Sequence, residues 1–376
     1  MILKNIRIFP MDRPPIERGY VAFAEGKITA LGPVEDCPAG EALDLNGGYL
    51  YPGLIDAHCH VGMFGDSVGV EGRDGNESTD PVTPHLRAID SIDPLDRCFS
   101  EAREAGITTV LTGPGSCNPI GGQFAAVKTA GRWVDEMILK APAAMKFALG
   151  ENPKSAYKGQ GRSPATRMAT AALIRETLAK AREYLRRRER GETPDFDAKL
   201  EALVPVVQGK LPAHFHAHKA NDIATAVRIA KEFGLDAVIV HATEGHLIPE
   251  LLAESGYPVI TGPIINDRSK PELAGQVTEN TARLRKTGVP AAICTDHPEN
   301  PILYLPLAAA LTVRAGLDRE EALRAVTIDA ARIAGIADRV GSIAVGKDAD
   351  FVVTDGDILA LGTAVQSVWI GGKQVK

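Results

Sequence analysis

Hydrophobic and polar residues follow two different patterns along this chain, one near its ends and one through its middle. Near the ends, apolar residues alternate with polar ones over short runs, as in Ile2–Ile8, Tyr20–Leu31 and Ala364–Ile370. Alternation of this kind is typical of strands in an antiparallel sheet. The two β-rich ends therefore predict a small β-sandwich domain that is built jointly from residues 1–52 and 340–376.

The middle of the chain alternates between short apolar runs and longer amphipathic ones. The predicted strands are Leu54–His58, Thr108–Thr112, Phe124–Lys128, Ala144–Leu149, Pro212–His216, Ala237–His241, Pro258–Gly262 and Ala291–Asp296. Helical patterns cover Pro94–Ala105, Thr166–Arg188, Asn221–Phe233, Leu247–Ser255, Thr278–Lys286, Leu305–Ala315 and Arg319–Ile333. This alternation predicts an α/β fold with a (β/α)8 barrel over residues 53–339. A doubly wound open sheet is the alternative, but no Gly-x-Gly-x-x-Gly sequence follows the first strand.

Composition narrows the class of protein further. The 376 residues are 44% hydrophobic and 24% charged, and the net charge of −6 disfavours nucleic-acid binding. There is no run of about 18 apolar residues, so we expect no membrane-spanning segment. The five cysteines are dispersed, which suits a reducing compartment better than a disulfide-linked secreted protein. We therefore expect a cytoplasmic protein that acts on small molecules and forms a homo-oligomer.

Side chains that can bind metal lie at the ends of four predicted strands. His58 and His60 follow the first strand, where their i, i+2 spacing turns both rings to the same side. His216 ends the fifth strand, His241 the sixth and Asp296 the eighth. In a barrel these strand ends meet at one mouth, where catalytic residues lie. Each residue alone would suit a hydrogen-bonded cap or a turn, but together they predict a metal site of imidazole and carboxylate ligands.

Three motifs resemble the amidohydrolase superfamily, and the resemblance extends over nearly the whole chain. Pro52–His60 is similar to its first-strand metal motif, and Asp329–Gly335 and Val340–Asp350 are similar to the segments by which its members leave the barrel. The pattern looks most like the imidazolonepropionase-related branch, which includes prolidase-like dipeptidases. The resemblance implies a barrel, a composite β-sandwich and one or two divalent metal ions. The ligand positions of the family match His58, His60, His216, His241 and Asp296.

The fourth predicted strand decides how many metal ions the resemblance implies. Two-metal members have a lysine there that carbon dioxide converts to a bridging carbamate, and other members use a glutamate. Lys146 is similar to the lysine of the two-metal members, and Glu151 is the alternative bridge. Carbon dioxide reacts only with an unprotonated amine, and a desolvated cationic site lowers the pKa of lysine as that reaction requires. Lys146 is the preferred bridge and implies two zinc ions per chain, although manganese also suits these ligands.

Such a site would hydrolyse a carbon–nitrogen bond in a small amide, a dipeptide, an N-acyl amino acid or a cyclic amide. The predicted nucleophile is a hydroxide that bridges the metal ions, with Asp296 as general base and acid. His218 is a second candidate catalytic residue, or a structural hydrogen-bonding one. A mononuclear deaminase is one alternative, although the glutamate that such members place after His216 is missing up to Asp222. A non-catalytic barrel used for assembly is another, which the complete ligand set disfavours.

Loops around the predicted mouth contain the candidates for substrate binding. A long polar segment spans residues 61–91, and a Gly-rich loop follows the second strand. Basic residues cluster after the fourth strand in a predicted loop that would cover the site. This loop would either bind an anionic group of the substrate or form an exposed basic lid without a ligand. The candidate substrate-binding residues are His85, Asn118, Gln123, Lys154, Tyr157, Arg162 and His297.

Overall fold

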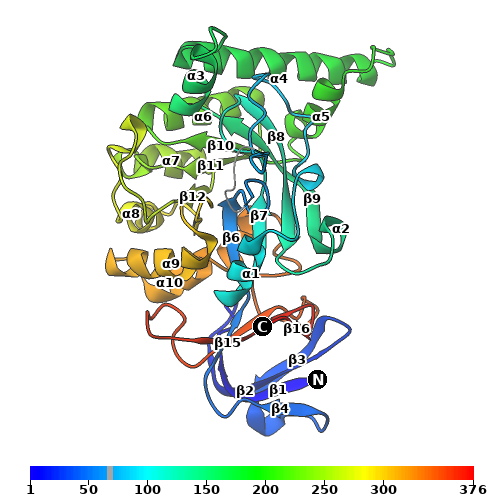
Figure 1. The fold of residues 1–376 in the computed structure, drawn as a ribbon, viewed down its shortest axis with the longest axis vertical. Coiled ribbons are helices and arrows are strands. Elements are labelled where there is room, and N and C mark those ends of the chain that lie inside the picture. Colours follow the sequence, from blue (N-terminus) through cyan, green and yellow to red (C-terminus); the bar gives the residue numbers. More distant parts are fainter. Residues whose placement is uncertain (66–70) are drawn as a thin grey trace.

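The computed structural model contains a barrel with surrounding helices and, below it in Figure 1, a separate sheet near which both ends of the chain lie. The structure describes residues 1–65 and 71–376. The barrel strands are β6 (Leu54–Cys59), β7 (Ile107–Thr112), β8 (Ile120–Lys128), β9 (Ile138–Ala148), β10 (Ala213–Ala217), β11 (Ala237–His241), β12 (Val259–Thr261) and β13 (Ala291–Ile293). They pair in the order β13-β12-β11-β10-β9-β8-β7-β6. This order confirms the predicted eight-stranded barrel.

Helices cover the outside of the barrel, and the longest one, α4, crosses the top of Figure 1. They are α1 (Arg97–Glu104), α2 (Val134–Met137), α3 (Glu151–Lys158), α4 (Arg167–Glu189), α5 (Ala198–Val207), α6 (Ala220–Phe233), α7 (Pro249–Ser255), α8 (Asn280–Lys286), α9 (Leu305–Arg314), α10 (Arg319–Ala325) and α11 (Ile328–Ile333). The 3-10 helices are η1 (Val34–Asp36), η2 (Ala88–Asp90), η3 (Gly245–Leu247), η4 (Pro271–Leu273) and η5 (Ile302–Tyr304). None of the helices in the described ranges is both long enough and apolar enough to cross a membrane.

Two helical predictions differ from the structure. The segment after the fourth strand, expected as a loop, begins with helix α3. The helix expected over Arg319–Ile333 is divided into α10 and α11 at Thr327, whose backbone dihedrals of −138° and −104° are not helical. The hydroxyl of Thr327 donates to the carbonyl of Leu323 at 2.6 Å. Serine and threonine hydroxyls compete in this way with the backbone hydrogen bonds of a helix, so the pattern of apolar residues alone did not show the break.

The third barrel strand, β8, runs antiparallel to both of its neighbours, although the sequence predicted a parallel strand. Thr112 of β7 is paired with Ala125, and Ile120 is paired with Phe147 of β9. Only residues 113–119 connect β7 to β8, whereas a parallel connection needs a crossover of about a dozen residues or more. The short connection therefore makes a hairpin and leaves residues 113–119 at the mouth where β7 ends.

The barrel closes between its first and last strands, β6 and β13. The backbone N–H of Asp296 donates to the carbonyl of His58 at 3.2 Å. Asp56, a buried residue of β6, accepts hydrogen bonds from both the backbone N–H and the hydroxyl of Thr295. These contacts hold the segment after β13 beside the end of β6.

Apolar side chains fill the barrel below its mouth. They include Ile55, Leu111, Phe124, Val240 and Ile260, and all of them are buried. The ring of Phe124 stacks on the imidazole of His58, with 5.0 Å between the centroids. These side chains fill the interior of the barrel. A site at the mouth is therefore closed on the side of the interior and opens on the opposite side.

Both ends of the chain contribute strands to the second sheet. These are β1 (Ile2–Ile8), β2 (Ile16–Ala24), β3 (Lys27–Pro33), β4 (Ala42–Asp44), β5 (Tyr49–Pro52), β14 (Phe351–Thr354), β15 (Val365–Ile370) and β16 (Lys373–Gln374). They form one path, β16-β15-β14-β5-β1-β2-β3, with β4 beside β1. The N-terminal and C-terminal strands of this sheet meet where Leu50 of β5 lies opposite Val353 of β14. Because β6 begins two residues after β5 ends, this sheet is joined directly to the first barrel strand.

We predict that Asp56→Asn destabilises the closed barrel. The amide NH2 group would face the donors of Thr295 where a carboxylate oxygen now accepts from them, and an unsatisfied buried group costs about 1–3 kcal/mol. The free energy of unfolding in denaturant, measured with chelator present, checks this. Thr295→Val removes only the hydroxyl donor and should cost less. Equal stability of Asp56→Asn and the wild-type protein would show that closure does not depend on this carboxylate.

Candidate metal centre

Two groups of potential metal ligands meet at the mouth of the barrel, at the ends of β6, β10, β11 and β13. Within each group the ligating atoms lie within 4.8 Å of one another. All of these side chains are buried. One group is His58, His60 and Asp296, and the other is His216, His218 and His241.

The alternation of side chains along β10 brings the second group together. His216 and His218 point to the same side, with 4.6 Å between their ring centroids, while Phe215, the residue before His216, stacks on Phe147. His241 at the end of β11 lies 4.6 Å from each of these rings. His241 has a φ of +71°, a backbone conformation that is costly for a residue with a side chain and is retained mostly at functional sites. The local strain is consistent with a functional role for this ring.

Backbone carbonyls fix the orientation of two site histidines. Nδ1 of His60 lies 2.6 Å from the carbonyl oxygen of Gly113, and Nδ1 of His241 lies 2.7 Å from that of Gly262. A carbonyl oxygen only accepts hydrogen bonds, so Nδ1 carries the proton in both rings. The lone pair of each Nε2 is therefore free to bind a metal ion, as in most histidine ligands of metalloproteins.

Hydroxyl groups occupy the same Nδ1 position in two of the other three rings, whereas Nδ1 of His58 is buried without a hydrogen-bond partner among the described residues. The Oγ atom of Ser116 lies 2.8 Å from Nδ1 of His216, and that of Thr243 lies 2.7 Å from Nδ1 of His218. Ser116 belongs to the hairpin loop between β7 and β8, so the unexpected direction of β8 supplies a residue that orients the site. In all four rings whose Nδ1 has a partner, Nε2 is the nitrogen left for a ligand.

The protonation of these rings suits metal binding. Burial lowers the pKa of His58, His216 and His218 well below the usual value. Burial also lowers the pKa of His241 to about 4. Nε2 of His241 is buried without a hydrogen-bond partner among the described residues. Neutral imidazoles with an unpartnered nitrogen in a buried cluster fit a divalent metal ion.

Asp296 lies between the two groups of ligands. Its Oδ1 atom is 3.3 Å from Nε2 of His60 and 3.6 Å from Nε2 of His58, and its Oδ2 atom is 4.0 Å from Nδ1 of His241. Burial acts to raise the pKa of Asp296, but His241, His60 and Lys146 outweigh burial and hold the pKa below its usual value. The carboxylate is therefore ionised at neutral pH. Its φ of +56° is a second strained backbone position in the site.

Lys146 is the ionisable residue of β9 that reaches the site. Its side chain is fully buried, and Nζ lies 3.1 Å from Nε2 of His58. Burial lowers the pKa of the amine to about 8. Glu151, the other candidate bridge, begins α3 and lines a neighbouring hollow together with Lys154 and Lys158. Lys146 and not Glu151 therefore lies beside the histidines.

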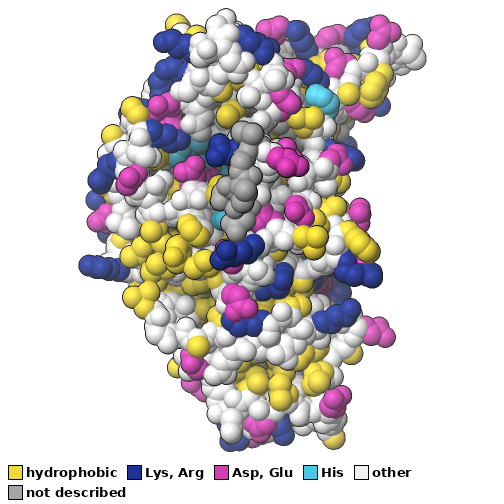
Figure 2. Space-filling model, viewed as in Figure 1, with side chains coloured by type: hydrophobic (Ala, Val, Ile, Leu, Met, Phe, Trp, Pro, Cys, Tyr) yellow, Lys and Arg dark blue, Asp and Glu magenta, His cyan; other side chains and the backbone are white. Residues whose placement is uncertain are grey.

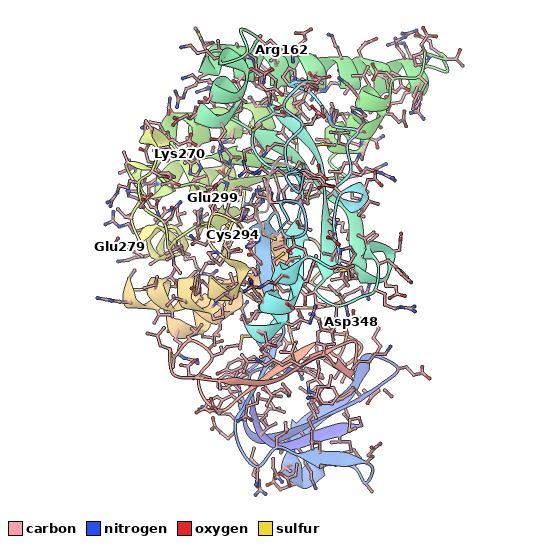
Figure 3. All side chains as sticks on the ribbon, viewed as in Figure 1. Arg162, Lys270, Glu279, Cys294, Glu299 and Asp348 are labelled. Atoms are coloured by element: carbon pink, nitrogen blue, oxygen red, sulfur yellow. The ribbon has the colours of Figure 1, made fainter. Side chains whose placement is uncertain are left out.

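A cavity of about 170 Å³ opens at the metal-ligand cluster. Histidine side chains are visible from outside in the upper half of Figure 2, over the barrel. Figure 3 labels Lys270 and Glu299 beside this mouth, on the loops that follow β12 and β13. The lining includes His60, Phe64, Asn76, Ser116, Cys117, Asn152, His216, His218, Asn266, Lys270, Asp296 and Glu299. The cavity is small and polar, and Lys270 is the cation in its lining.

Several predicted substrate-binding residues hold the surrounding loops together instead of lining this cavity. The hydroxyl of Tyr157 donates to the amide oxygen of Asn118 at 2.6 Å. Gln123 donates to the carbonyl of Pro84 at 3.2 Å. Their polar groups are thus already paired within the protein.

The remaining candidates point elsewhere. Arg162 donates to the carbonyl of Thr79 and lies near α4, away from Lys270 in Figure 3. Lys154 lines the hollow of Glu151, and His85 lines a separate one beside residues 73–77. The imidazole of His297 accepts from the backbone N–H of Ile302 at 3.2 Å. The long polar segment over residues 61–91 includes residues 66–70, which lie outside the described residues.

Comparison with known proteins agrees with this geometry. Residues 49–375 match the model of the amidohydrolase family. The chain belongs to this family. The predicted superfamily is therefore confirmed.

The solved structure of an amidohydrolase from Thermotoga maritima MSB8 is 41% identical to this chain, with a TM-score of 0.96 over 100% of this chain and 99% of that one. Amidohydrolase tasK of Hapsidospora irregularis is 30% identical over 95% of this chain, which spans only 39% of that longer relative. Imidazolonepropionase of Maricaulis maris is 27% identical over 90% of this chain and 88% of its own length. The likeness thus extends through both the barrel and the sheet of the two termini.

We predict that Ser116→Ala weakens metal binding by about 10- to 100-fold, the usual effect of removing a partner that orients a histidine ligand. Metal content after dialysis against a chelator measures this. Ser100→Ala is the matched control, because the hydroxyl of Ser100 donates to the carbonyl of Arg97 on the outside of α1. Equal metal retention in the two variants would contradict the orienting role of Ser116.

Proposed function

We propose that this chain is a two-metal hydrolase that cleaves a carbon–nitrogen bond in a small amide, a dipeptide, an N-acyl amino acid or a cyclic amide. The observation that carries the proposal is the pair of facing ligand groups, with the carboxylate of Asp296 between them and the amine of Lys146 beside them. A single metal ion would leave one of the two buried ligand groups without a role. Two ions would give a role to both ligand groups.

In this proposal His58, His60 and Asp296 hold one zinc ion, and His216, His218 and His241 hold the other. Manganese also suits these ligands. The bound ions supply Lewis-acid polarisation of the scissile carbonyl and lower the pKa of water towards neutrality. His218, expected from the sequence as a catalytic residue, is assigned here to the ligand shell of the second ion.

Lys146 contributes as a carbamate. A protonated amine beside His58 would repel a divalent cation, whereas a pKa of about 8 leaves part of the amine neutral at pH 7. The neutral nitrogen attacks the carbon of carbon dioxide, a nitrogen–carbon bond forms and one proton is released. The product is a carbamate anion, whose oxygen atoms can serve as ligands for the ions that both groups would hold.

Asp296 moves the proton of the reaction. Its carboxylate is ionised and lies near both ligand groups, so it can accept a proton from the attacking water and deliver that proton to the leaving nitrogen. The strained backbone of Asp296 and its hydrogen bond to His58 fix the carboxylate before substrate arrives.

Lys270 is the proposed site for an anionic group of the substrate. A lysine ammonium has three donors. One faces the carboxylate of Glu272 at 2.8 Å, and another donates to the amide oxygen of Asn152 at 3.1 Å. The third is available to the cavity, whose small volume favours a compact substrate. The name of the relative from Maricaulis maris suggests a cyclic amide with a carboxylate side chain as one compound to test.

We predict that zinc-loaded protein hydrolyses at least one compound in a panel of dipeptides, N-acyl amino acids and cyclic amides. Asp296→Asn, assayed at a zinc concentration that keeps both sites filled, should lower kcat by about 100- to 10,000-fold, because the proton carrier is lost. Release of amine and metal content by elemental analysis measure the two quantities. Ammonia released only from a heterocycle would favour the deaminase alternative. Undiminished turnover in Asp296→Asn would exclude the proposed role.

We predict that wild-type protein labelled with 13C-bicarbonate gives a carbamate carbon resonance, and that Lys146→Met lacks both this resonance and the second metal ion. Lys154→Met is the control, because Lys154 lies on α3 and lines the neighbouring hollow. A wild-type protein with two ions but no carbamate signal would show that the unmodified amine occupies the site.

A further inference from the structure

Glu272 places a carboxylate at the mouth of the barrel from a segment in which the sequence showed no ligand motif. It lies on η4, in the loop after β12, and its side chain is only 1% exposed. The Oε2 atom accepts a hydrogen bond from the backbone N–H of Glu151 at 2.9 Å. The Oε1 atom has no hydrogen-bond partner among the described residues, although the ammonium of Lys270 lies 2.8 Å away. Lys270 is therefore one cation beside this buried oxygen, which no donor of the described residues reaches with hydrogen-bond geometry.

The same Oε1 atom also faces two of the candidate metal ligands. Oε1 lies 3.7 Å from Nε2 of His218 and 4.0 Å from Nε2 of His216. Both separations exceed the range of about 2.7–3.2 Å for a hydrogen bond between nitrogen and oxygen. Two ligands of one tetrahedral zinc ion, each about 2.0–2.2 Å from it, lie about 3.3–3.6 Å apart. The observed separations are thus close to those of ligands that share an ion.

Building on the two-metal function above, we propose that Glu272 is a further protein ligand of the ion held by His216, His218 and His241. These three imidazoles are neutral, so they contribute no charge to balance a divalent ion. Glu272 contributes one negative charge on the side of the ion that faces the loop after β12. A mixed shell of imidazole and carboxylate ligands is also one that both zinc and manganese accept.

The surroundings of Glu272 are shaped to hold its carboxylate in this position. A Cβ atom on Gly150 would lie 2.8 Å from Oε2, and Gly150 has a φ of +85°, so only glycine allows the close approach. Lys270 is itself held by the amide oxygen of Asn152, at 3.1 Å. The backbone N–H of Glu151 therefore holds Oε2, and Oε1 lies between the ammonium of Lys270 and the two histidines.

The competing explanation is that Glu272 serves only as the ion-pair partner of Lys270. The two explanations differ in their expectation for Glu272→Asp. Aspartate keeps the negative charge near Lys270 but draws the oxygen back by the length of one methylene group. A mere ion pair would tolerate this change, whereas a metal ligand would not.

The test compares metal binding by the full-length wild-type chain with that of Glu272→Gln and Glu272→Asp. Each protein is stripped with a chelator, and zinc is then titrated in competition with a chromophoric chelator. We expect two zinc ions in the wild-type protein and a loss of about 10- to 100-fold in affinity at one site in each variant. The visible absorption spectrum of each cobalt-substituted variant should also differ from that of the cobalt-substituted wild-type protein. Glu299→Gln is the matched control, because Glu299 also lines the cavity but is exposed, and should bind both ions as the wild-type protein does.

The outcomes separate this proposal from the proposed function. Two tightly bound zinc ions and an unchanged cobalt spectrum in both Glu272 variants would overturn the role of Glu272 and leave the two-metal hydrolase intact. A wild-type protein that binds no ion through His216, His218 and His241 would overturn both. If Glu272→Gln fails to fold, as judged by circular dichroism, Glu272→Asp carries the test alone, since it retains the charge that Lys270 requires.

Discussion

Closure of the barrel between β6 and β13 is the constraint on which the rest of the site depends. The two strands come from opposite ends of the barrel segment, and they are joined where Asp296 donates to His58 and Thr295 donates to Asp56. Without this closure, Asp296 would not lie 3.3 Å from His60. The hydrogen bonds that complete the fold are therefore also the ones that assemble the first ligand group.

Hydrogen bonds within the protein orient most of the candidate metal ligands. The rings of His60 and His241 are oriented by backbone carbonyls, and those of His216 and His218 by hydroxyl groups. The stacked ring of Phe124 supports the site from the apolar interior. Such an arrangement removes most of the conformational freedom that the side chains would lose on binding, so more of the binding free energy remains for the metal.

Loops supply what the strands do not. The hairpin between β7 and β8 brings Ser116 to His216, and the loop after β12 brings Lys270 and Glu272 to the cavity. Strand ends thus provide the expected imidazoles, whereas loops determine the charge around them and the shape of the space for substrate. Differences in substrate among relatives with the same ligands are expected to lie in these loops.

The sequence by itself determined the parts of this protein that follow from periodicity. Side chains at i and i+2 in a strand share a face, and barrel strands end at one mouth. The sequence alone therefore predicted that five side chains lie close together, namely His58, His60, His216, His241 and Asp296. The amidohydrolase family also followed from motifs within the chain. These features depend on short-range spacing and on a repeated architecture, both of which are visible in one dimension.

Only the tertiary structure decided the direction of β8, the separation of Glu151 from the site and the approach of Glu272. It also showed that Tyr157 and Asn118 bond to each other rather than line the cavity. Loop residues have no period that fixes the direction of a side chain, and their partners lie far away in the sequence, such as Glu272 for the N–H of Glu151. Packing between distant segments sets these contacts, which is why the candidate metal ligands at strand ends were predictable and the residues around them were not.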